Sequence, residues 1–460
     1  MQNKTQHSAK PGSIRRSWFQ LSMVTLAVSA LIFAATEARS QTYRVLYSFT
    51  GEADGANPGS TIFSYDMPAT GGELTWAGDG DLYGTTSDGG KNIGQCCGGV
   101  IFKVDKYGQE TTLYEFQGPP DGGDPTVGVI RDANDNIFGV TTWGGASSSG
   151  WYGTLFKLQR DWNEITLHSF EYPAGMGALQ SVNPSYSGLL RNDDDGTLLG
   201  AMSLGGDGGC TGVNMSDEQV VTGCGAIYKH DRTTGQTTVL YSFTGGADGW
   251  YPSGDLARDA NGTIYGTTWG GGLDDTGTIF KVDTSGKQTV LYSFTFGADG
   301  WGPIGIIRDA ATGTLYGATG DGGTGTTHPY AAGTIYKLDT AGKFTVLYTF
   351  TGGTDGGYPY AQPLKIGDDL YGTTFSGGDM SACGGIGCGV VYKVDAAGKE
   401  TVLHAFTGGA DGANPYWGLT PDAKGNLYGA AGAGGLVPAI CAGQPGIAPG
   451  CGVVFKITFP

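Results

Sequence analysis

Short apolar runs separated by glycine-rich turns follow one another along the chain after residue 40. One run, with the pattern Val-Leu-Tyr-Ser-Phe, recurs seven times with small changes, and successive copies start 51 to 73 residues apart. The copies lie at 45–49, 112–116, 166–170, 239–243, 290–294, 346–350 and 402–406. An apolar unit that repeats in this way predicts a repeat architecture rather than several unrelated domains.

Each repeat is predicted to form four strands, which we name a to d. In the copy that ends at Phe294, the strands are expected at 254–259, 263–268, 278–283 and 288–294. Asn-Gly lies between the first two runs and Ser-Gly between the last two. Such pairs favour tight hairpin turns between short strands. No run shows the 3.6-residue period of an amphipathic helix.

The two ends of the repeat array are complementary. The array begins at 43–49 with a strand d that has no strand c before it, and it ends at 452–459 with a strand c that has no strand d after it. Pairing the two would complete a seventh unit and leave no exposed sheet edge. We therefore predict an all-β fold, a seven-bladed β-propeller of four-stranded antiparallel blades whose last blade is closed by the N-terminal strand. The alternative, a stacked solenoid, gives no reason for complementary ends.

The strand order also predicts two unequal faces. In an antiparallel blade the d–a and b–c connections share one side, which we call the loop face, and the a–b and c–d connections share the other, the turn face. The d–a and b–c loops are long and variable, and the first d–a loop carries an insertion at about 60–72. Because binding residues concentrate on loops held by a rigid scaffold, we expect any function on the loop face.

Residues 1–40 have the features of a signal peptide. Basic residues, including the pair Arg15-Arg16, precede a largely apolar run at 21–35, and small residues at 38 and 40 fit cleavage before Gln41. The apolar run is shorter than the roughly 20 residues of a membrane span, which favours cleavage over an uncleaved anchor. General and twin-arginine export both stay open. We predict a signal peptide at 1–40, a propeller at 41–460, and a secreted or periplasmic location.

The mature chain would be strongly acidic. Residues 1–40 contain five basic residues and one acidic residue, so their removal changes the formal net charge from −17 to −21. Such a surface repels nucleic acid and anionic membranes. No later run is long and apolar enough to span a bilayer. We expect a monomer with no nucleic-acid partner and no membrane span after cleavage.

The eight cysteines fall in the b–c loops, in four local groups. An even number of cysteines in an exported chain favours disulfides. The predicted disulfides are Cys210–Cys224, Cys383–Cys388 and Cys441–Cys451. Whether the adjacent Cys96 and Cys97 form a bridge or stay reduced is left open. A zinc site needs four ligands in one place, whereas these groups lie on different blades, so we expect no metal and no other cofactor.

The repeat unit has a recognisable sequence motif in three parts: Val-Leu-Tyr-Ser-Phe-Thr-Gly-Gly-Ala-Asp-Gly at 239–249, Leu-Ala-Arg-Asp-Ala-Asn-Gly-Thr-Ile-Tyr-Gly-Thr-Thr at 256–268, and Gly-Thr-Ile-Phe-Lys-Val-Asp at 277–283. It resembles the GloVer tandem repeat, a family of exported bacterial proteins with variable anchoring tails, over essentially all of 43–459. The resemblance implies export and a propeller-like fold but no catalytic residues. The strand order is similar to that of NHL-type propellers, which is a likeness of fold alone.

The d–a loops repeat Asp-Gly and are followed by aromatic residues, while other rings close strand b on the same face. Aspartate before glycine commonly closes a turn. Exposed rings beside carboxylates suit carbohydrate, and the alternative is that the rings fill the gaps between neighbouring blades. The candidate ligand-binding residues are Trp143, Asp248, Trp250, Tyr251, Trp269, Asp299, Trp301, Tyr358, Phe375, Asp411 and Trp417.

Three functional hypotheses follow. The first is an exported binding or scaffold propeller that engages a glycan or a cell-surface protein through the loop face. The second is a carbohydrate-active lyase or hydrolase, which needs a pair of carboxyl groups about 5–10 Å apart at the channel mouth. The third is a purely structural surface protein without a concave pocket. No nucleophile motif or metal-ligand histidine spacing is present, so we assign no catalytic residue.

Overall fold

The computed structural model describes residues 1, 41–58, 73–90, 98–146, 152–170, 181–182, 187–192, 195–207, 209–213, 219–221, 223–324, 332–437, 441 and 448–460. The chain divides into a unit of Tyr43–Thr458 and a second unit of Met1–Thr42 with Phe459–Pro460. The predicted insertion at 60–72 and the Cys96–Cys97 pair lie outside the described residues, as does the predicted signal peptide apart from Met1. None of the described helical segments has the length and apolar character to cross a lipid bilayer.

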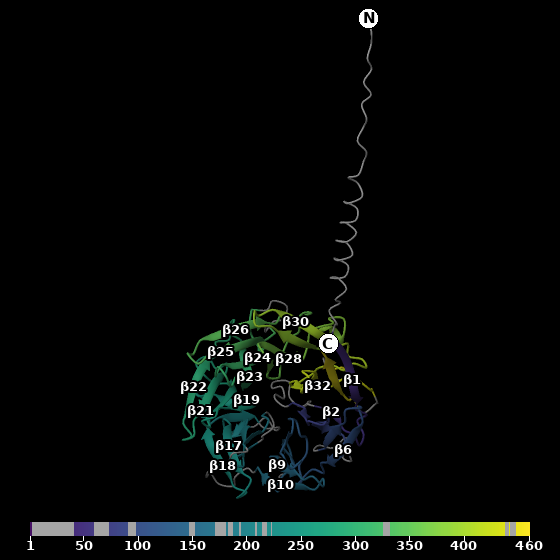
Figure 1. Cartoon of the computed structure of the whole chain (residues 1–460). Coiled ribbons are helices and arrows are strands. Elements are labelled where there is room, and N and C mark those ends of the chain that lie inside the picture. Colours follow the sequence, from purple (N-terminus) through teal and green to yellow (C-terminus); the bar gives the residue numbers. More distant parts are fainter. Residues whose placement is uncertain are drawn as a thin grey trace. The chain divides into compact units, whose positions relative to one another are not determined.

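The unit Tyr43–Thr458 is a seven-bladed propeller, as the sequence predicts, and each blade is an antiparallel sheet. Figure 1 looks onto the ring and shows, in blades 4 and 5, strand a nearest the centre and strand d at the rim. Blade 1 contains β2 (Ala56–Pro58) with β3 (Thr75–Trp76), β4 (Leu82–Asp88), β5 (Val100–Val104) and β6 (Glu110–Glu115). Blade 2 contains β7 (Ile130–Arg131), β8 (Ile137–Thr141), β9 (Thr154–Leu158) and β10 (Glu164–Ser169). Blade 3 contains β12 (Leu190–Asn192), β13 (Thr197–Met202), β17 (Ala226–Asp231) and β18 (Thr237–Ser242).

The remaining four blades follow the same a-to-d order. Blade 4 contains β19 (Trp250–Arg258), β20 (Ile264–Gly270), β21 (Thr278–Val282) and β22 (Gln288–Ser293). Blade 5 contains β23 (Trp301–Arg308), β24 (Leu315–Asp321), β25 (Thr334–Leu338) and β26 (Phe344–Thr349). Blade 6 contains β27 (Leu364–Ile366), β28 (Asp369–Thr374), β29 (Val390–Val394) and β30 (Glu400–Ala405). Blade 7 contains β31 (Thr420–Pro421), β32 (Leu427–Ala431), β33 (Val453–Thr458) and β1 (Thr42–Ser48).

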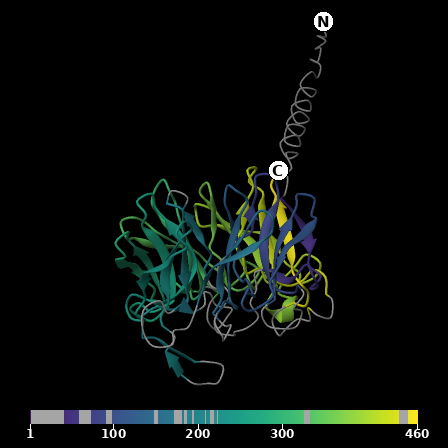
Figure 2. The same ribbon diagram turned by 90° about the horizontal axis from the view of Figure 1, so that it is seen from below.

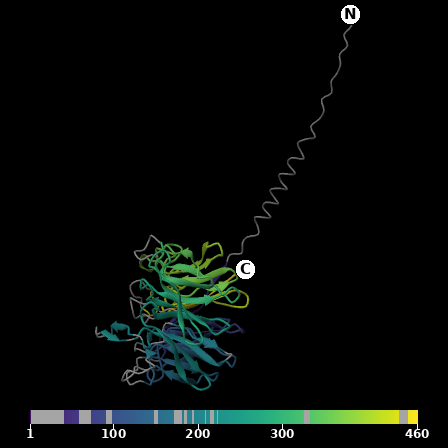
Figure 3. The same ribbon diagram turned by 90° about the vertical axis from the view of Figure 1, so that its left-hand side faces the viewer.

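A few short elements decorate the loop face. In blade 3, β11 (Ser181–Val182) pairs with β14 (Leu204–Gly205), and β15 (Thr211–Val213) pairs with β16 (Gln219–Val221). Figures 2 and 3 show the propeller edge-on, with a teal hairpin projecting from one side. A turn of 3-10 helix, η1 (Cys383–Gly385), lies in the b–c loop of blade 6.

The N-terminal strand closes the ring. Strand β1 pairs with β33 as the fourth strand of blade 7, and the amide of Phe49 donates to the carbonyl of Gly452 over 3.0 Å. The predicted pairing of the first and last strands is therefore confirmed. Because both edges of the array are used, the ring presents no open edge at the junction of the two ends.

One aromatic contact holds each pair of neighbouring blades together. Phe49 at the end of strand d in blade 7 meets Phe102 of strand c in blade 1 edge to face, with ring centroids 5.0 Å apart. Phe102 in turn lies over Gly84 of strand b, where a Cβ atom would come within 2.6 Å of the ring. The other six interfaces repeat this contact with centroids 5.0 to 5.5 Å apart: Phe116–Phe156, Phe170–Tyr228, Phe243–Phe280, Phe294–Tyr336, Phe350–Tyr392 and Phe406–Phe455. The recurring Phe and the recurring Gly of the repeat are thus explained by a single packing arrangement.

A backbone hydrogen bond accompanies the ring contact on the loop face. The residue before the proline that precedes strand a adopts a left-handed conformation, as at Tyr251 (φ 60°) and Tyr358 (φ 59°). Its amide then donates to a carbonyl just before strand c of the preceding blade, from Tyr251 to Cys224 over 2.9 Å and from Tyr358 to Ala332 over 2.8 Å. In blade 4 this bond lies inside a longer strand a, since β19 begins at Trp250 rather than at the expected residue 254.

The three predicted disulfides are present, as Cys210–Cys224, Cys383–Cys388 and Cys441–Cys451. In each, the second cysteine lies just before strand c, and its carbonyl accepts the hydrogen bond from the next blade: Tyr251 to Cys224, Asn414 to Cys388 and Asn57 to Cys451. Each disulfide therefore fixes a loop at the point where the neighbouring blade is attached.

Ring closure makes a prediction for stability. Phe49 and Phe243 are both fully buried and occupy equivalent places, one at the junction of the chain ends and one inside the array. Because the ring is closed, Phe49→Ala and Phe243→Ala should each lower the free energy of unfolding by a similar amount, about 3–5 kcal/mol. Denaturant unfolding measures this. Tyr107→Ala, at a side chain 75% exposed in a turn, is the control, and a Phe49→Ala variant as stable as that control would contradict closure.

Candidate functional site

Each blade places one equivalent residue around the axis of the propeller, within strand a in blades 4 and 5 and two residues before it in the others. We call these positions the axial ring, and they follow from the pairing of strands a and b in each blade. In blade order they are Glu73, Gly128, Gly188, Asp255, Gly305, Gln362 and Gly418. Four glycines thus alternate irregularly with three polar side chains long enough to reach across the axis.

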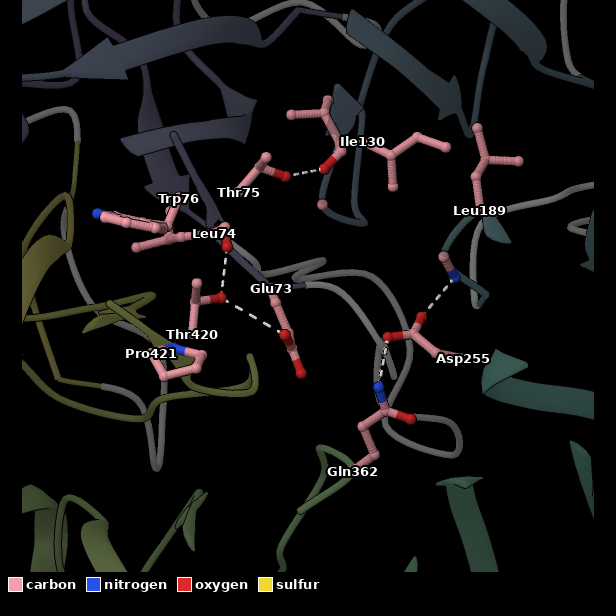
Figure 4. A pocket seen from close by; sticks show the side chains of 13 residues that line it. Glu73, Leu74, Thr75, Trp76, Ile130, Leu189, Asp255, Gln362, Thr420 and Pro421 are labelled. Carbon is pink, nitrogen blue, oxygen red and sulfur yellow. Dashed lines mark hydrogen bonds between the residues drawn. The ribbon is translucent and has the colours of Figure 1, made fainter. Parts of the chain in front are cut away.

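The polar members of the axial ring bond to one another and to other blades (Figure 4). One oxygen of Asp255 accepts the amide of Gly188 over 2.8 Å, and the other accepts Nε2 of Gln362 over 2.9 Å. The hydroxyl of Thr420 in blade 7 donates to Glu73 over 3.4 Å. These bonds connect blades 1, 3, 4, 6 and 7 through their innermost strands.

The glycines of the axial ring leave the space that these side chains occupy. A Cβ atom on Gly188 would lie 2.2 Å from an oxygen of Asp255, and one on Gly418 would lie 3.0 Å from Cγ of Glu73. A Cβ atom on Gly305 would lie 3.0 Å from Cβ of Gln362. The mixture of glycine and long polar residues at this level is therefore a matched set.

A cavity of about 330 Å³ lies in the channel beside the axial ring. Its polar floor includes Glu73, Asp255 and Gln362, and its walls include Leu189 and Pro421. The other lining residues come after the axial-ring positions, as far as Trp76 in blade 1 and Pro421 in blade 7, and lead towards the a–b turns. The cavity consequently occupies the turn-face half of the channel.

The electrostatics of the axial ring favour a protonated carboxyl group. Burial and the negative charge of Asp255 raise the pKa of Glu73 from 4.5 to about 8, against the opposing hydrogen bonds from Gln362 and Thr420. Asp255 already accepts two hydrogen bonds. At neutral pH the proton on Glu73 removes the repulsion between two carboxylates in a confined space.

The loop aspartates proposed as ligand contacts are used to close their own turns. Asp248 accepts the hydroxyl of Tyr241 and the amide of Thr244, both over 2.8 Å. The equivalent donors to Asp299 are Tyr292 at 3.0 Å and Thr295 at 2.9 Å, and those to Asp411 are His404 at 3.1 Å and Thr407 at 3.0 Å. This is the turn chemistry expected of Asp-Gly. The recurring tyrosine of strand d, or His404 in its place, donates a hydrogen bond to this carboxylate.

Aromatic side chains gather on the loop face in two neighbouring clusters. In the first, over blades 6 and 7, Tyr360 contacts Tyr358, Phe375 and Tyr416 with ring centroids 5.8 to 6.1 Å apart. In the second, over blades 4 and 5, Trp301 contacts Trp269 at 5.8 Å and Phe296 at 5.6 Å, and Trp250 packs against the group that holds Trp269. Tyr360 packs against that same group, so the two clusters are continuous.

The candidate rings differ in their access to solvent. Trp250, Trp301, Tyr358 and Phe375 are half-buried and lie in these clusters. Trp143 is also half-buried, but it lies apart from them and donates its Nε1 to Asp124 over 2.9 Å.

Three of the candidate residues are buried and are therefore not surface contacts. Trp417 is 1% exposed in the hydrophobic core between blades 7 and 1, and its Nε1 donates to the carbonyl of Thr126. Tyr251 and Trp269 are 5% and 7% exposed. These three rings support the face from beneath, which is the packing role that the sequence left open.

The structure adds residues that the candidate set lacked. Tyr360 and Tyr416 lie in the first aromatic cluster, and Phe296, 56% exposed, lies in the second. Glu73, Asp255 and Gln362 form the axial ring. A position-by-position alignment of the seven repeats would have found both, because each of these residues departs from what most repeats carry at its place. Within the described residues, no group of three or more His, Cys, Asp or Glu side chains is placed to hold a metal ion.

The repeats of this chain match a known sequence family. The sequence model of the Gloeobacter/Verrucomicrobia repeat matches residues 29–213, 201–328 and 324–460. A search of curated proteins found no match. Among solved structures, an oligogalacturonate lyase from Vibrio parahaemolyticus is 11% identical, with 92% of this chain and 97% of that chain covered and a TM-score of 0.47. A protein from Bacteroides fragilis described as a putative 6-phosphogluconolactonase is 15% identical, with 83% and 98% covered and a TM-score of 0.44.

The raised pKa of Glu73 predicts how stability depends on pH. A carboxyl group whose pKa is higher in the folded protein than in the unfolded chain stabilises the fold below about pH 4.5, and this contribution disappears as the pH rises through about 8. The free energy of unfolding should therefore fall between pH 5 and 8. Glu73→Gln should reduce that fall by about 1 kcal/mol or more, measured by denaturant titration at several pH values. Glu52→Gln, at an exposed loop residue, should leave the pH dependence as it is in the parent protein; an equal effect of both variants would refute the assignment.

Proposed function

The chain belongs to the Gloeobacter/Verrucomicrobia repeat family, and we propose that it is an exported binding propeller that engages a glycan through the aromatic clusters of its loop face. The two clusters bring half-buried rings from blades 4 to 7 onto one side of a rigid ring of sheets. Aromatic residues with one packed side and one accessible side are suited to stacking against the apolar faces of sugars. This gathering of rings is the observation that carries the proposal.

Export is supported by chemistry at two places. Three disulfides staple the b–c loops, and disulfides persist mainly in oxidising compartments such as the periplasm and the medium. The basic and apolar segments before Gln41 suit a signal peptide. A secreted or periplasmic binding protein is consistent with both.

The two alternatives receive less support from the site. An enzyme that cleaves a glycan needs two carboxyl groups facing the substrate, but Asp248, Asp299 and Asp411 are engaged in their own turns. In the axial ring, Asp255 accepts hydrogen bonds from Gly188 and Gln362, and Glu73 accepts one from Thr420. A purely structural role predicts no concave pocket, whereas the channel holds a cavity of about 330 Å³.

The proposal is tested by removing the half-buried rings together. Trp250→Ala, Trp301→Ala and Tyr358→Asn change the loop face without emptying the core; asparagine is chosen because Asn57 and Asn414 occupy the same left-handed position in other blades. Losing several stacking contacts of about 0.5–1.5 kcal/mol each should weaken glycan binding at least tenfold. Retention of the full chain on insoluble polysaccharides and bacterial cell-wall preparations measures this.

Tyr107→Ala on a turn between strands c and d serves as the matched control, since it removes an exposed ring from outside the clusters. Circular dichroism and thermal unfolding of the triple variant confirm that the ring of blades is intact. Unchanged retention of a folded triple variant would eliminate the glycan proposal. Retention by a purified surface protein instead would favour a protein partner.

A further inference from the structure

Phe296 occupies a backbone position that suits glycine. It is the second residue after the buried phenylalanine that ends strand d, and its φ is 58°. The other described copies carry glycine here with φ between 72° and 80°: Gly51, Gly118, Gly245, Gly352 and Gly408. A bulky side chain in the left-handed region is strained. Among the described copies Phe296 alone carries this strain, which points to a purpose at that place.

Space for this ring exists because blade 4 lacks a disulfide. In blade 3, a Cβ atom on Gly245 would lie 2.3 Å from the sulfur of Cys210, and in blade 6 one on Gly408 would lie 2.9 Å from the sulfur of Cys388. The b–c loop of blade 4, residues 271–277, contains no cysteine. The loop of blade 4 is therefore free of the disulfide that blocks the position in blades 3 and 6.

The space is not used to bury the ring. Phe296 is 56% exposed, although its ring contacts Trp301 at 5.6 Å between centroids. Trp301 contacts Trp269, whose ring lies against Gly302, where a Cβ atom would be 2.9 Å away. An exposed ring that packs on Trp301, which in turn packs on Trp269, forms a fixed apolar surface rather than part of the core.

The loop segments around Phe296 carry negatively charged side chains and no positively charged ones. Residues 244–251, 269–277, 295–302 and 321–324 contain five aspartates and neither lysine nor arginine. One of them, Asp321, pairs with Trp301 across β23 and β24, and burial raises its pKa to about 7. The negative charge of such a border repels carboxylate and sulfate groups.

We propose that Phe296, supported by Trp301, forms the central stacking platform of the glycan site, and that the site selects an uncharged polysaccharide over a polyuronate. This rests on the proposed function and adds its location and its class of ligand. The strained ring provides the accessible stacking surface. The aspartates beside it discriminate against acidic sugars.

The test uses Phe296→Gly and Phe296→Asn, which restore residue types that tolerate the left-handed conformation. Both should keep or raise the melting temperature of the full chain, because strain is relieved and little buried surface is lost. Both should lower retention on cellulose and chitin about tenfold. The parent protein should show weaker retardation in gels containing polygalacturonate than in gels containing hydroxyethylcellulose.

Each other outcome has a defined meaning. If Phe296→Gly binds as well as the parent while the triple variant at 250, 301 and 358 does not, the loop face binds glycan and the role of Phe296 is refuted. If the parent prefers polygalacturonate, the uncharged ligand class is refuted and the proposed function survives. If the parent binds none of these polymers, this inference and the glycan function fail together.

Discussion

The pairing of β1 with β33 is the constraint on which the other features of this protein depend. It joins the two ends of the array through the sheet of blade 7, so that the contact between Phe49 and Phe102 becomes one of seven equivalent contacts. Each blade is then held on both sides by the same edge-to-face packing and by hydrogen bonds between backbones. In an open array, blade 7 would lack its outer strand and blade 1 would lack a neighbour.

The repetition explains which parts of the structure the sequence could predict. The strands, their order, the closure and the three disulfides all follow from residues that recur at fixed places, because each copy obeys the same packing rule. The axial ring was not predicted, since Glu73, Asp255 and Gln362 are far apart in sequence and are joined only by the curvature of the ring. None of these three residues stands out in the sequence until the seven repeats are aligned at strand a.

The same reasoning explains the mixed outcome for the aromatic candidates. Trp250 is the second residue after Asp248, where the chain still crosses the loop face, and its ring is half-buried. Trp417 is the sixth residue after Asp411, one residue before the axial-ring position Gly418, and its ring is 1% exposed in the core between blades 7 and 1. Both follow a loop aspartate, so the motif alone predicts the same role for both. Only the path of the backbone separates a surface ring from a core ring.

The axial ring and the aromatic clusters are mechanically connected through β19. This strand carries Trp250 at its first residue and Asp255 in its middle, and Asp255 is tied to blade 3 through Gly188 and to blade 6 through Gln362. A strand fixed at its centre holds the ring at its end in one orientation. Binding to rings that are already ordered loses less conformational entropy than binding to mobile ones. The polar network at the axis therefore fixes the strand that presents Trp250, and under the proposed function it would order the loop face without touching a ligand there.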